Sequence, residues 1–244
     1  MILPTFLPSE KPNIVLLSFN VVDGNNASEW CKNLSNVFKK YDVKATVFIT
    51  GAIAETNSNC ITDFTESIDI GSLTYNYVQL NEIPDYLQQL DEIKNGKKAI
   101  DSVGNIESRV FRAPYGNTDD NIYSLLTRSE IFADFSYADH YNKYYDGKFI
   151  KFDISSYNGD NFSPDILKQK SNNPIVISFD NTTPVDQIDR FISSIKSHST
   201  LFINTSDLVG FNLTIRSESV WVKWIQNYTL LKIGILKKYQ TKDE

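Results

Sequence analysis

The chain has few side chains suited to metal binding or to proton transfer near neutral pH. His140 and His198 are its only histidines, and Cys31 and Cys60 are its only cysteines, among 244 residues. Imidazole and thiolate groups are the main zinc ligands, and imidazole is the usual general base near neutral pH. The cysteines form no Cys-x-x-Cys pair, so a zinc or redox motif of that kind is excluded. They are either two buried thiols or one disulfide of a secreted protein.

Neither histidine lies in a pattern that predicts catalysis. His140 falls in the polar and aromatic stretch DHYNKYYDG, which we interpret as an exposed loop. His198 falls at the end of a predicted helix, where a cation interacts favourably with the last turn. The sequence therefore gives little support for catalysis or metal binding by histidine.

Apolar runs of strand length alternate with amphipathic helical patterns through most of the chain. The predicted strands are Ile14–Phe19, Lys44–Ile49, Ile68–Leu73, Arg109–Arg112, Ile131–Phe135, Phe149–Ile154, Ile175–Phe179 and Leu201–Ile203. The predicted helices are Ser28–Tyr41 with Ser28 as its cap, Glu82–Ile100, Asp119–Thr127, Pro164–Lys170 with Ser163 as its cap, and Val185–Ser197. This alternation is typical of β/α units around a parallel sheet. The sequence predicts an α/β fold: one closed or nearly closed (β/α) barrel.

We expect three regions along the chain. Residues 1–13 form an N-terminal extension, residues 14–210 form the barrel, and residues 211–244 form a C-terminal helix packed on the barrel exterior. The alternative for this helix is a docking surface for a partner or lipid. Trp221 and Trp224 motivate that alternative, because two tryptophans on one face are costly to leave in water.

Charge and hydropathy exclude some classes of partner. The chain has 24 Lys+Arg and 30 Asp+Glu, a formal net charge of −6, and no polybasic stretch, so nucleic acid and anionic lipid surfaces are disfavoured as partners. The sequence contains no run of about 18 apolar residues, so it predicts no transmembrane segment. The opening MILPTFLPSEKP is no signal peptide as it stands, although a removed one is compatible with it. Seven N-x-[S/T] sequons favour a secreted protein, at Asn26, Asn33, Asn161, Asn181, Asn204, Asn212 and Asn227.

Four strings lie on these elements in a characteristic order. They are LLSFNVVDG with YDVKATVFITG, then DIGSLTYNYVQL, then FRAPYG, and finally NPIVISFDN with TLFINTSDL. Together they resemble the strings of polysaccharide deacetylases, the NodB-homology family of carbohydrate esterases that includes chitin deacetylases. The resemblance implies a single-domain distorted (β/α) barrel with about seven parallel strands, in agreement with the predicted elements. It also implies a polymer of N-acetylated sugar as the substrate.

The resemblance implies a divalent metal such as zinc, held by one aspartate and two histidines, with a second aspartate as base and a histidine as acid. In this chain the base position is Asn20, the metal-ligand positions are Val21, Leu73 and Tyr77, and the acid position is Phe179, or Ser178 in a register shifted by one. None of these side chains is a carboxylate or an imidazole, so the chain lacks the groups that activate water in the family. We expect no catalytic residue and no bound metal cofactor.

Other parts of the family's site are retained. Arg112 pairs with the base aspartate in the family, so here we expect it to find another acceptor in Asp23 or Asp153. The backbone N–H of Tyr115 helps to hold the oxyanion in the family. The candidate sugar-binding residues are Arg112, Tyr115, Tyr77 and Asp153, and the side chains expected to line the old metal site are Leu73, Tyr77 and Phe179. An aromatic cleft can stack on a sugar ring, whereas the alternative is that the turn with Arg112 and Tyr115 only closes the barrel.

These observations lead to one hypothesis and two alternatives. The hypothesis is an inactive polysaccharide deacetylase homologue, secreted or at the cell surface, that is a structural or chitin-binding component of a wall or coat. The first alternative is an active metal-dependent deacetylase of N-acetylglucosamine polymers, with a site rebuilt around Asp23 and Asp153. The second is a partner-binding scaffold that uses the C-terminal helix.

Overall fold

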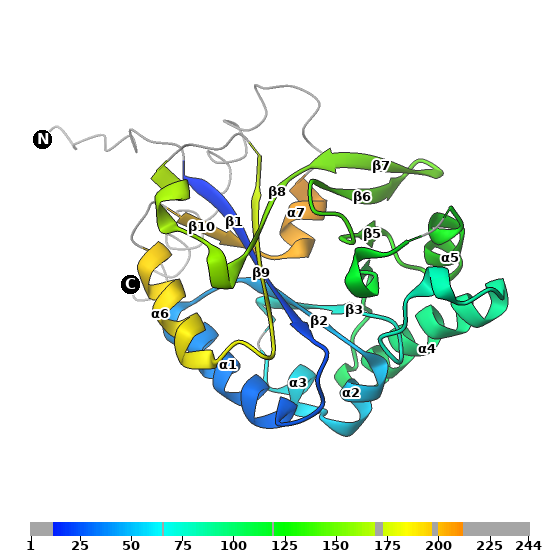
Figure 1. The fold of residues 1–244 in the computed structure, drawn as a ribbon, viewed down its shortest axis with the longest axis horizontal. Helices are drawn as coiled ribbons and strands as arrows, with labels where there is room; N and C mark the ends of the chain where they lie inside the picture. The colour runs from blue at the N-terminus through cyan, green and yellow to red at the C-terminus, as the bar shows by residue number, and fades with distance from the viewer. Residues whose placement is uncertain (1–11, 65, 119, 169–172, 197–199, 212–244) are drawn as a thin grey trace, which may run out of the picture. The chain divides into compact units, whose positions relative to one another are not determined.

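The computed structural model describes residues 12–64, 66–118, 120–168, 173–196 and 200–211 (Figure 1). The chain divides into two units, Met1–Thr205 and Ser206–Glu244, and the first contains all the strands of the sheet. The predicted C-terminal helix with Trp221 and Trp224 lies outside the described residues, as do His198 and residues 1–11 of the predicted extension. The predicted site falls within the first unit.

One curved sheet forms the centre of the first unit. Its strands are β1 (Asn13–Val21), β2 (Ala45–Ile49), β3 (Ile68–Ser72), β4 (Val110–Phe111), β5 (Ala133–Asp134), β6 (His140–Tyr145), β7 (Lys148–Asp153), β8 (Ser155–Asn158), β9 (Ile175–Asp180) and β10 (Thr200–Ile203). Their order is β7-β6-β5-β4-β3-β2-β1-β9-β8, and β10 pairs with the first part of β1. Only Ile154 separates β7 from β8 in the chain, so the sheet curves nearly into a closed barrel. The predicted fold class is confirmed.

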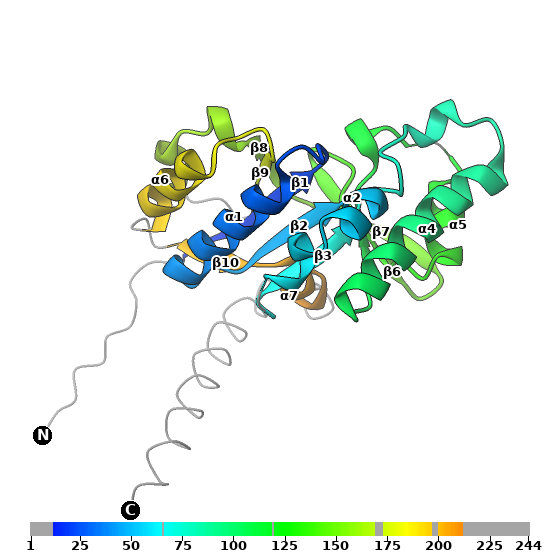
Figure 2. The same ribbon diagram turned by 90° about the horizontal axis from the view of Figure 1, so that it is seen from below.

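Helices follow most of the parallel strands, and those of the first unit lie against the sheet (Figures 1 and 2). They are α1 (Ala27–Tyr41), α2 (Gly51–Thr56), α3 (Asn59–Thr62), α4 (Tyr86–Gly104), α5 (Ile122–Arg128), α6 (Val185–Lys196) and α7 (Thr205–Phe211). Four 3₁₀ turns are η1 (Leu80–Glu82), η2 (Pro114–Gly116), η3 (Gly159–Asn161) and η4 (Pro164–Lys168). The helix predicted at residues 164–170 is therefore a 3₁₀ turn where the structure describes it.

The predicted starts of two helices are wrong. α1 begins at Ala27, and Ser28 donates a hydrogen bond to Asn57 at 2.9 Å instead of capping the helix. α4 begins at Tyr86 rather than four residues earlier, because Asp85 accepts hydrogen bonds from the first free backbone N–H groups of that helix. A proline just before this cap marks the boundary in the sequence.

An antiparallel hairpin, β6–β7, interrupts the parallel pattern. The interpretation of the stretch around His140 as an exposed loop is wrong, since His140 begins β6, which pairs with β5 and β7. Asp146 and Gly147 join the two strands with φ values of 49° and 82°, the geometry that an Asp-Gly turn favours in hairpins. Eight strands therefore pair in parallel and two form the hairpin, against about seven parallel strands predicted.

Side chains alternate between the two faces of β1 and β9. Phe19 and Val21 of β1 and Phe179 of β9 belong to the apolar cluster that the sheet shares with α1 and α6. Asn20 and Asp180 are paired across β1 and β9, one residue out of step with that cluster. Because successive strand residues point to opposite faces, Asn20 and Asp180 share the inner face, away from α1 and α6.

A disulfide joins Cys31 of α1 to Cys60 of α3. Both residues are fully buried within the apolar cluster beneath these helices. Of the two alternatives for the cysteines, the disulfide is therefore confirmed. Disulfides form and persist mainly in oxidising compartments.

Candidate functional site

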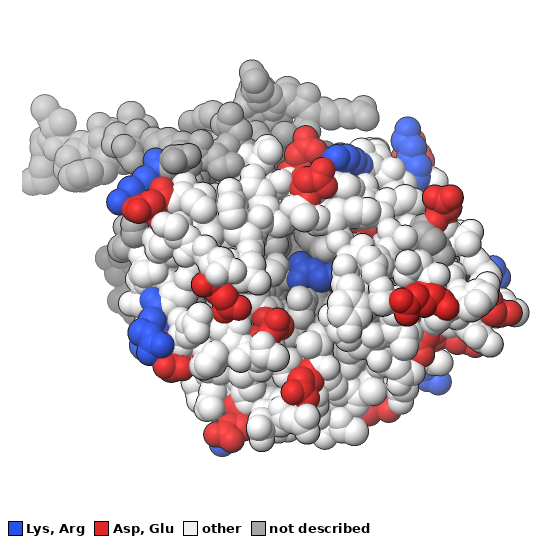
Figure 3. Space-filling model, viewed as in Figure 1, with Lys and Arg blue, Asp and Glu red and all other residues white. Residues whose placement is uncertain are grey.

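Three strand ends and one loop bring polar side chains together on the inner face. Asn20 ends β1, Asp180 ends β9, Arg112 follows β4, and Tyr77 lies in the segment after β3. Arg112 contacts Asn20, and the Tyr77 hydroxyl lies within the electrostatic reach of both Arg112 and Asp180. In the orientation of Figure 1, a hollow beside β9 has basic atoms at its base and acidic side chains around it (Figure 3).

Arg112 is held in place without a carboxylate. Its Nη1 donates to Asn20 Oδ1 at 2.9 Å, and its Nε donates to the Phe135 carbonyl oxygen at 3.1 Å. The guanidinium lies 4.3 Å from the centre of the Phe48 ring, a cation–π contact. Burial lowers the pKa of Arg112 to about 10, because water is removed from the charged form.

The expectation that Asp23 or Asp153 accepts from Arg112 is wrong. Asp153 lies in β7 with 70% of its side chain exposed and one oxygen 4.0 Å from Lys151. Asp23 lies in the loop after β1, where its Oδ1 accepts from the backbone and side-chain nitrogens of Asn25 at 2.9 Å. The amide at the end of β1 is already within reach of Arg112, so the guanidinium needs no distant carboxylate.

Tyr77 and Tyr115 form an aromatic pair at the site. Their ring centres are 5.0 Å apart, and Tyr115 is 67% exposed. The backbone of Tyr115 hydrogen-bonds the Tyr77 hydroxyl, so the N–H donates to that oxygen. Burial raises the pKa of Tyr77, and electrostatic interactions with Tyr115 and Asp180 raise it further. The Tyr115 N–H and Arg112 act to lower it. Both residues have positive φ, 59° and 58°, which turns the chain sharply at each position.

The three metal-ligand positions do not fit a divalent cation. Val21 is fully buried in the apolar cluster on the helix side of the sheet, and Leu73 is 1% exposed and apolar. Tyr77 offers a hydroxyl that already accepts the N–H of Tyr115. Among the described residues, no group of three or more His, Cys, Asp or Glu side chains is placed to hold a metal ion. Apolar side chains provide no donor atoms for a hard cation.

Phe179 does not line this site, contrary to expectation. Its ring stacks on Phe19 with centres 5.5 Å apart and meets the Phe191 ring at 5.1 Å, within the cluster that packs on α1 and α6. The next residue, Asp180, faces the inner side beside Asn20. Sequence reasoning missed Asp180, although the two-residue period of a strand predicts that neighbours on β9 face opposite ways.

Asn181 connects the end of β9 to the loop after β1. Its Oδ1 accepts from the backbone N–H of Val22 at 3.0 Å and of Asp23 at 3.1 Å, and its Nδ2 donates to the Asp23 carbonyl oxygen at 2.6 Å. This amide fixes the loop that borders Asn20. In the sequence, Asn181 is recognisable only as a sequon.

His140 lies in the hairpin rather than at the strand ends. Its ring stacks on Tyr137 at 4.3 Å, and its Nδ1 contacts Asp139. Nothing in these contacts points to catalysis, which agrees with the expectation that His140 lies outside the site.

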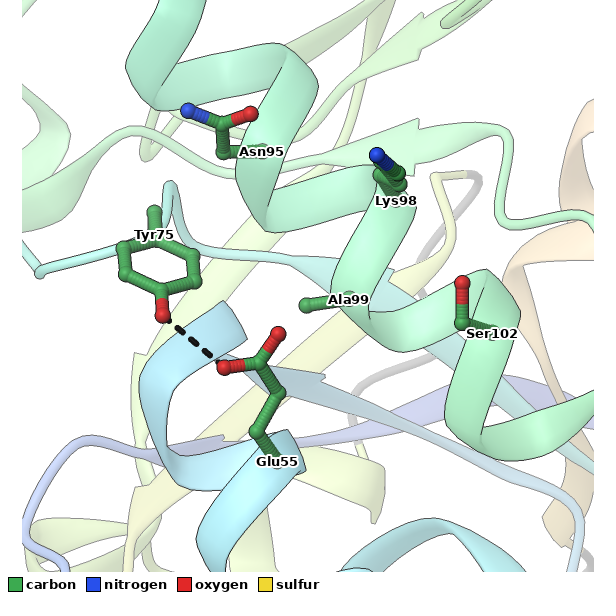
Figure 4. Close-up of a pocket in the computed structure, with 6 residues that line it drawn as sticks. All are labelled: Glu55, Tyr75, Asn95, Lys98, Ala99 and Ser102. Atoms are coloured by element: carbon green, nitrogen blue, oxygen red, sulfur yellow. Dashed lines mark hydrogen bonds between the residues drawn. The ribbon is translucent and has the colours of Figure 1, made fainter.

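A separate polar pocket of about 370 Å³ lies between α2 and α4 (Figure 4). On one side of it, the Tyr75 hydroxyl donates a hydrogen bond of 2.9 Å to Glu55. Asn95 and Lys98 come from α4 on its other side. It does not include any of the residues that the sequence predicts for sugar binding.

Residues 8–131 match the model of a protein family described as polysaccharide deacetylase. This match covers half of the chain, so the chain belongs to the polysaccharide deacetylase family. No curated protein matches the chain.

Solved structures of the same fold include active and inactive proteins. A family 4 carbohydrate esterase pseudoenzyme from Bacillus anthracis is 18% identical, with a TM-score of 0.60 over 82% of this chain and 66% of its own. The peptidoglycan deacetylase PdaC from Bacillus subtilis is 15% identical, with a TM-score of 0.62 over 88% and 98%. A putative polysaccharide deacetylase from Mycobacterium smegmatis is 14% identical, with a TM-score of 0.65 over 84% and 91%. At these identities the likeness is one of fold.

Proposed function

We propose that this protein is a catalytically inactive member of its family and a structural or glycan-binding component of a cell wall or coat. The contact between the Tyr77 hydroxyl and the backbone of Tyr115 carries the proposal. The N–H of Tyr115 is the donor that the family resemblance assigns to the oxyanion. Here a side chain of the same protein occupies it, so it is not free to stabilise charge on a substrate.

The positions for base and metal support the same proposal. Asn20 cannot take a proton from water, and its oxygen is bound by Arg112. Val21 and Leu73 are buried apolar side chains at positions where the family holds its metal. Deacetylation of an amide requires an activated water and a stabilised oxyanion together. Here the groups that activate water are replaced, and the oxyanion donor is bound to Tyr77. We therefore expect no resident metal.

The relatives are compatible with loss of activity on this fold. The pseudoenzyme from Bacillus anthracis shares the barrel, and a mutant of that pseudoenzyme is described as having restored enzymatic activity. A barrel of this kind can therefore persist without activity. A glycan ligand follows from the family and from the exposed Tyr115 ring next to Tyr77, since aromatic faces stack on sugars.

Location outside the cytoplasm is part of the proposal. The Cys31–Cys60 disulfide supports an oxidising compartment. No helix in the described part of the chain is long and apolar enough to cross a bilayer. The similar proteins include a peptidoglycan deacetylase, which acts on a wall polymer.

The test is acetate release from N-acetylglucosamine oligomers with added Zn²⁺ or Co²⁺. We expect none, under conditions in which an active family member such as PdaC is tested in parallel. Turnover that is lost in Asp23→Ala or Asp153→Ala would contradict the proposal and favour the rebuilt-site alternative. Neither carboxylate contacts Arg112, so no observation in the structure favours that alternative.

A scaffold acting through the C-terminal helix depends on residues outside the described part of the chain. Glycan binding that survives deletion of residues 217–244 and is lost in Arg112→Ala would argue against this scaffold.

A further inference from the structure

Asp180 presents a carboxylate to the inner-face hollow. Within the described residues, no ion pair neutralises its charge. Its Oδ1 accepts from the backbone N–H of Thr182 at 2.9 Å and from the Thr182 hydroxyl. Within the described residues, its second oxygen has no hydrogen-bond partner and the side chain belongs to no ion pair. A carboxylate with a free oxygen at a hydrated surface is suited to bind an ammonium group.

Two further carboxylates lie close to the end of β9. Asp160 accepts from the Thr183 hydroxyl at 3.1 Å, and Asp23 is tied to the same turn through Asn181. No described ion pair includes either of them. Figure 3 shows acidic side chains around the hollow, so its rim favours a cation even though its base is basic.

The cation in this region is already committed to other groups. Two donors of the Arg112 guanidinium are bound by Asn20 and Phe135, and one of its faces lies over Phe48. Arg112 and Asp180 are both half-buried, and Asp180 has the oxygen that is free of hydrogen bonds. A ligand in the hollow can therefore bind the free oxygen of Asp180, whereas two donors of the guanidinium are already bound.

An N-acetyl group requires the opposite chemistry. Its carbonyl oxygen needs a donor, and the Tyr115 N–H that could supply one is bound to Tyr77. An unsubstituted sugar amine is protonated at acidic to neutral pH and carries three donors and no acceptor. It can use the free oxygen of Asp180 and needs nothing from Tyr115.

We propose that this hollow, taken as the glycan site of the proposed function, prefers sugars with a free amine to sugars with an N-acetyl group. Tyr77 and Tyr115 provide the stacking surface for the ring, and Asp180 binds the ammonium. The protein would then recognise the product type of a deacetylase rather than its substrate type. The preference depends on the proposed function for its ligand class, but not on its claim of inactivity.

Calorimetric titration of the whole protein with a glucosamine hexamer and with an N-acetylglucosamine hexamer, both at pH 6 and low salt, tests the preference. We expect the glucosamine hexamer to bind at least about tenfold more tightly, the usual size of one hydrogen bond to a charged group. In Asp180→Asn we expect this ratio to fall to about one. Asparagine keeps an oxygen for Thr182, so the turn is preserved, and circular dichroism checks the fold.

Asp160→Asn is the matched control, since it removes an equal charge from the same rim. It should leave most of the preference in place. Equal affinity for both hexamers, no binding of either, or an equal loss of preference in Asp160→Asn would overturn the inference. Tighter binding of an oligogalacturonate would also overturn it, because the Arg112 charge would then dominate. Acetate release would instead contradict the proposed function, so the two failures are distinguishable.

Discussion

On β1 and β9, adjacent residues point to opposite faces of the sheet, one apolar and the other polar. On the helix side, Val21 and Phe179 are buried in the apolar cluster, and Phe179 stacks on Phe19. On the inner side, Asn20 and Asp180 remain polar, and Asn20 accepts a hydrogen bond from Arg112. The apolar residues add to the core, whereas the polar residues belong to the proposed binding site.

This difference separates the stability of the barrel from its chemistry. Val21 and Phe179 stabilise the fold, because each buries apolar area in the cluster shared with α1 and α6. A protein can therefore lose the reaction and keep the barrel. The inner face still offers an aromatic pair and a carboxylate, the groups on which the proposed binding rests.

The largest effect is expected on the helix side. Phe179→Ala removes a ring that is 3% exposed and contacts Phe19 and Phe191, so it should lower the free energy of unfolding by about 4 kcal/mol. Urea unfolding measures this change. Tyr115→Ala removes an exposed ring from the inner side and should cost less than about 1 kcal/mol. Similar losses in both variants would contradict the difference between the two faces.

A buried carboxylate tests how much a polar group with an unbonded oxygen lowers the free energy of unfolding. Asp134 is fully buried, and Ser136 binds only one of its oxygens; the other has no partner among the described residues. Burial raises the pKa of Asp134 to about 6, above its unfolded value of 3.8, while Ser136, His140 and Arg112 act to lower it. Its contribution to stability is therefore fully present below pH 3.8 and is lost as the pH rises through 6.

The pH profile of urea unfolding checks this assignment. Between pH 4 and pH 7, the wild type should lose up to about 3 kcal/mol relative to Asp134→Asn, which does not titrate. Parallel profiles for the two proteins would contradict it, because they would show that ionisation of Asp134 does not lower the free energy of unfolding.

A carboxylate placed on the inner face at residue 20 should change the free energy of unfolding by a smaller amount. Asn20→Asp places a carboxylate against the Arg112 guanidinium and should raise the free energy of unfolding at pH 7 by about 1 kcal/mol. Asp180 at the paired position limits the gain through like-charge repulsion. The new carboxyl would have a folded pKa below its unfolded value of about 3.9, so the gain is present above that pH and lost as the pH falls. A destabilised variant at pH 7 would refute the contact.

The smallest effect concerns the Tyr77 hydroxyl, which accepts the backbone N–H of Tyr115. Tyr77→Phe leaves the Tyr115 N–H without its partner and should cost about 1 kcal/mol or less in thermal unfolding. Tyr75→Phe, which removes an exposed hydrogen bond to Glu55, is the control and should be nearly neutral. No difference between the two variants would remove the support for an occupied donor.

The sequence predicts the barrel because its strands are long apolar runs separated by helical patterns. It fails at the β6–β7 hairpin, because HYNKYY is polar and aromatic and only the Asp-Gly turn indicates a pair of strands. The site is predicted in part: Arg112, Tyr77 and Tyr115 come together, but Asp153 lies in the hairpin. The direction of each side chain depends on register, which the motif strings do not contain.

Zinc binding tests the central claim that the barrel has kept its fold and lost its metal centre. Equilibrium dialysis of the whole protein with Zn²⁺ measures the bound metal, and thermal unfolding with and without Zn²⁺ measures its effect on stability. A metal that binds only the folded state must raise the Tm. We predict less than about 0.1 zinc per chain and an unchanged Tm. One tightly bound zinc per chain, with a Tm raised by several degrees, would contradict the account.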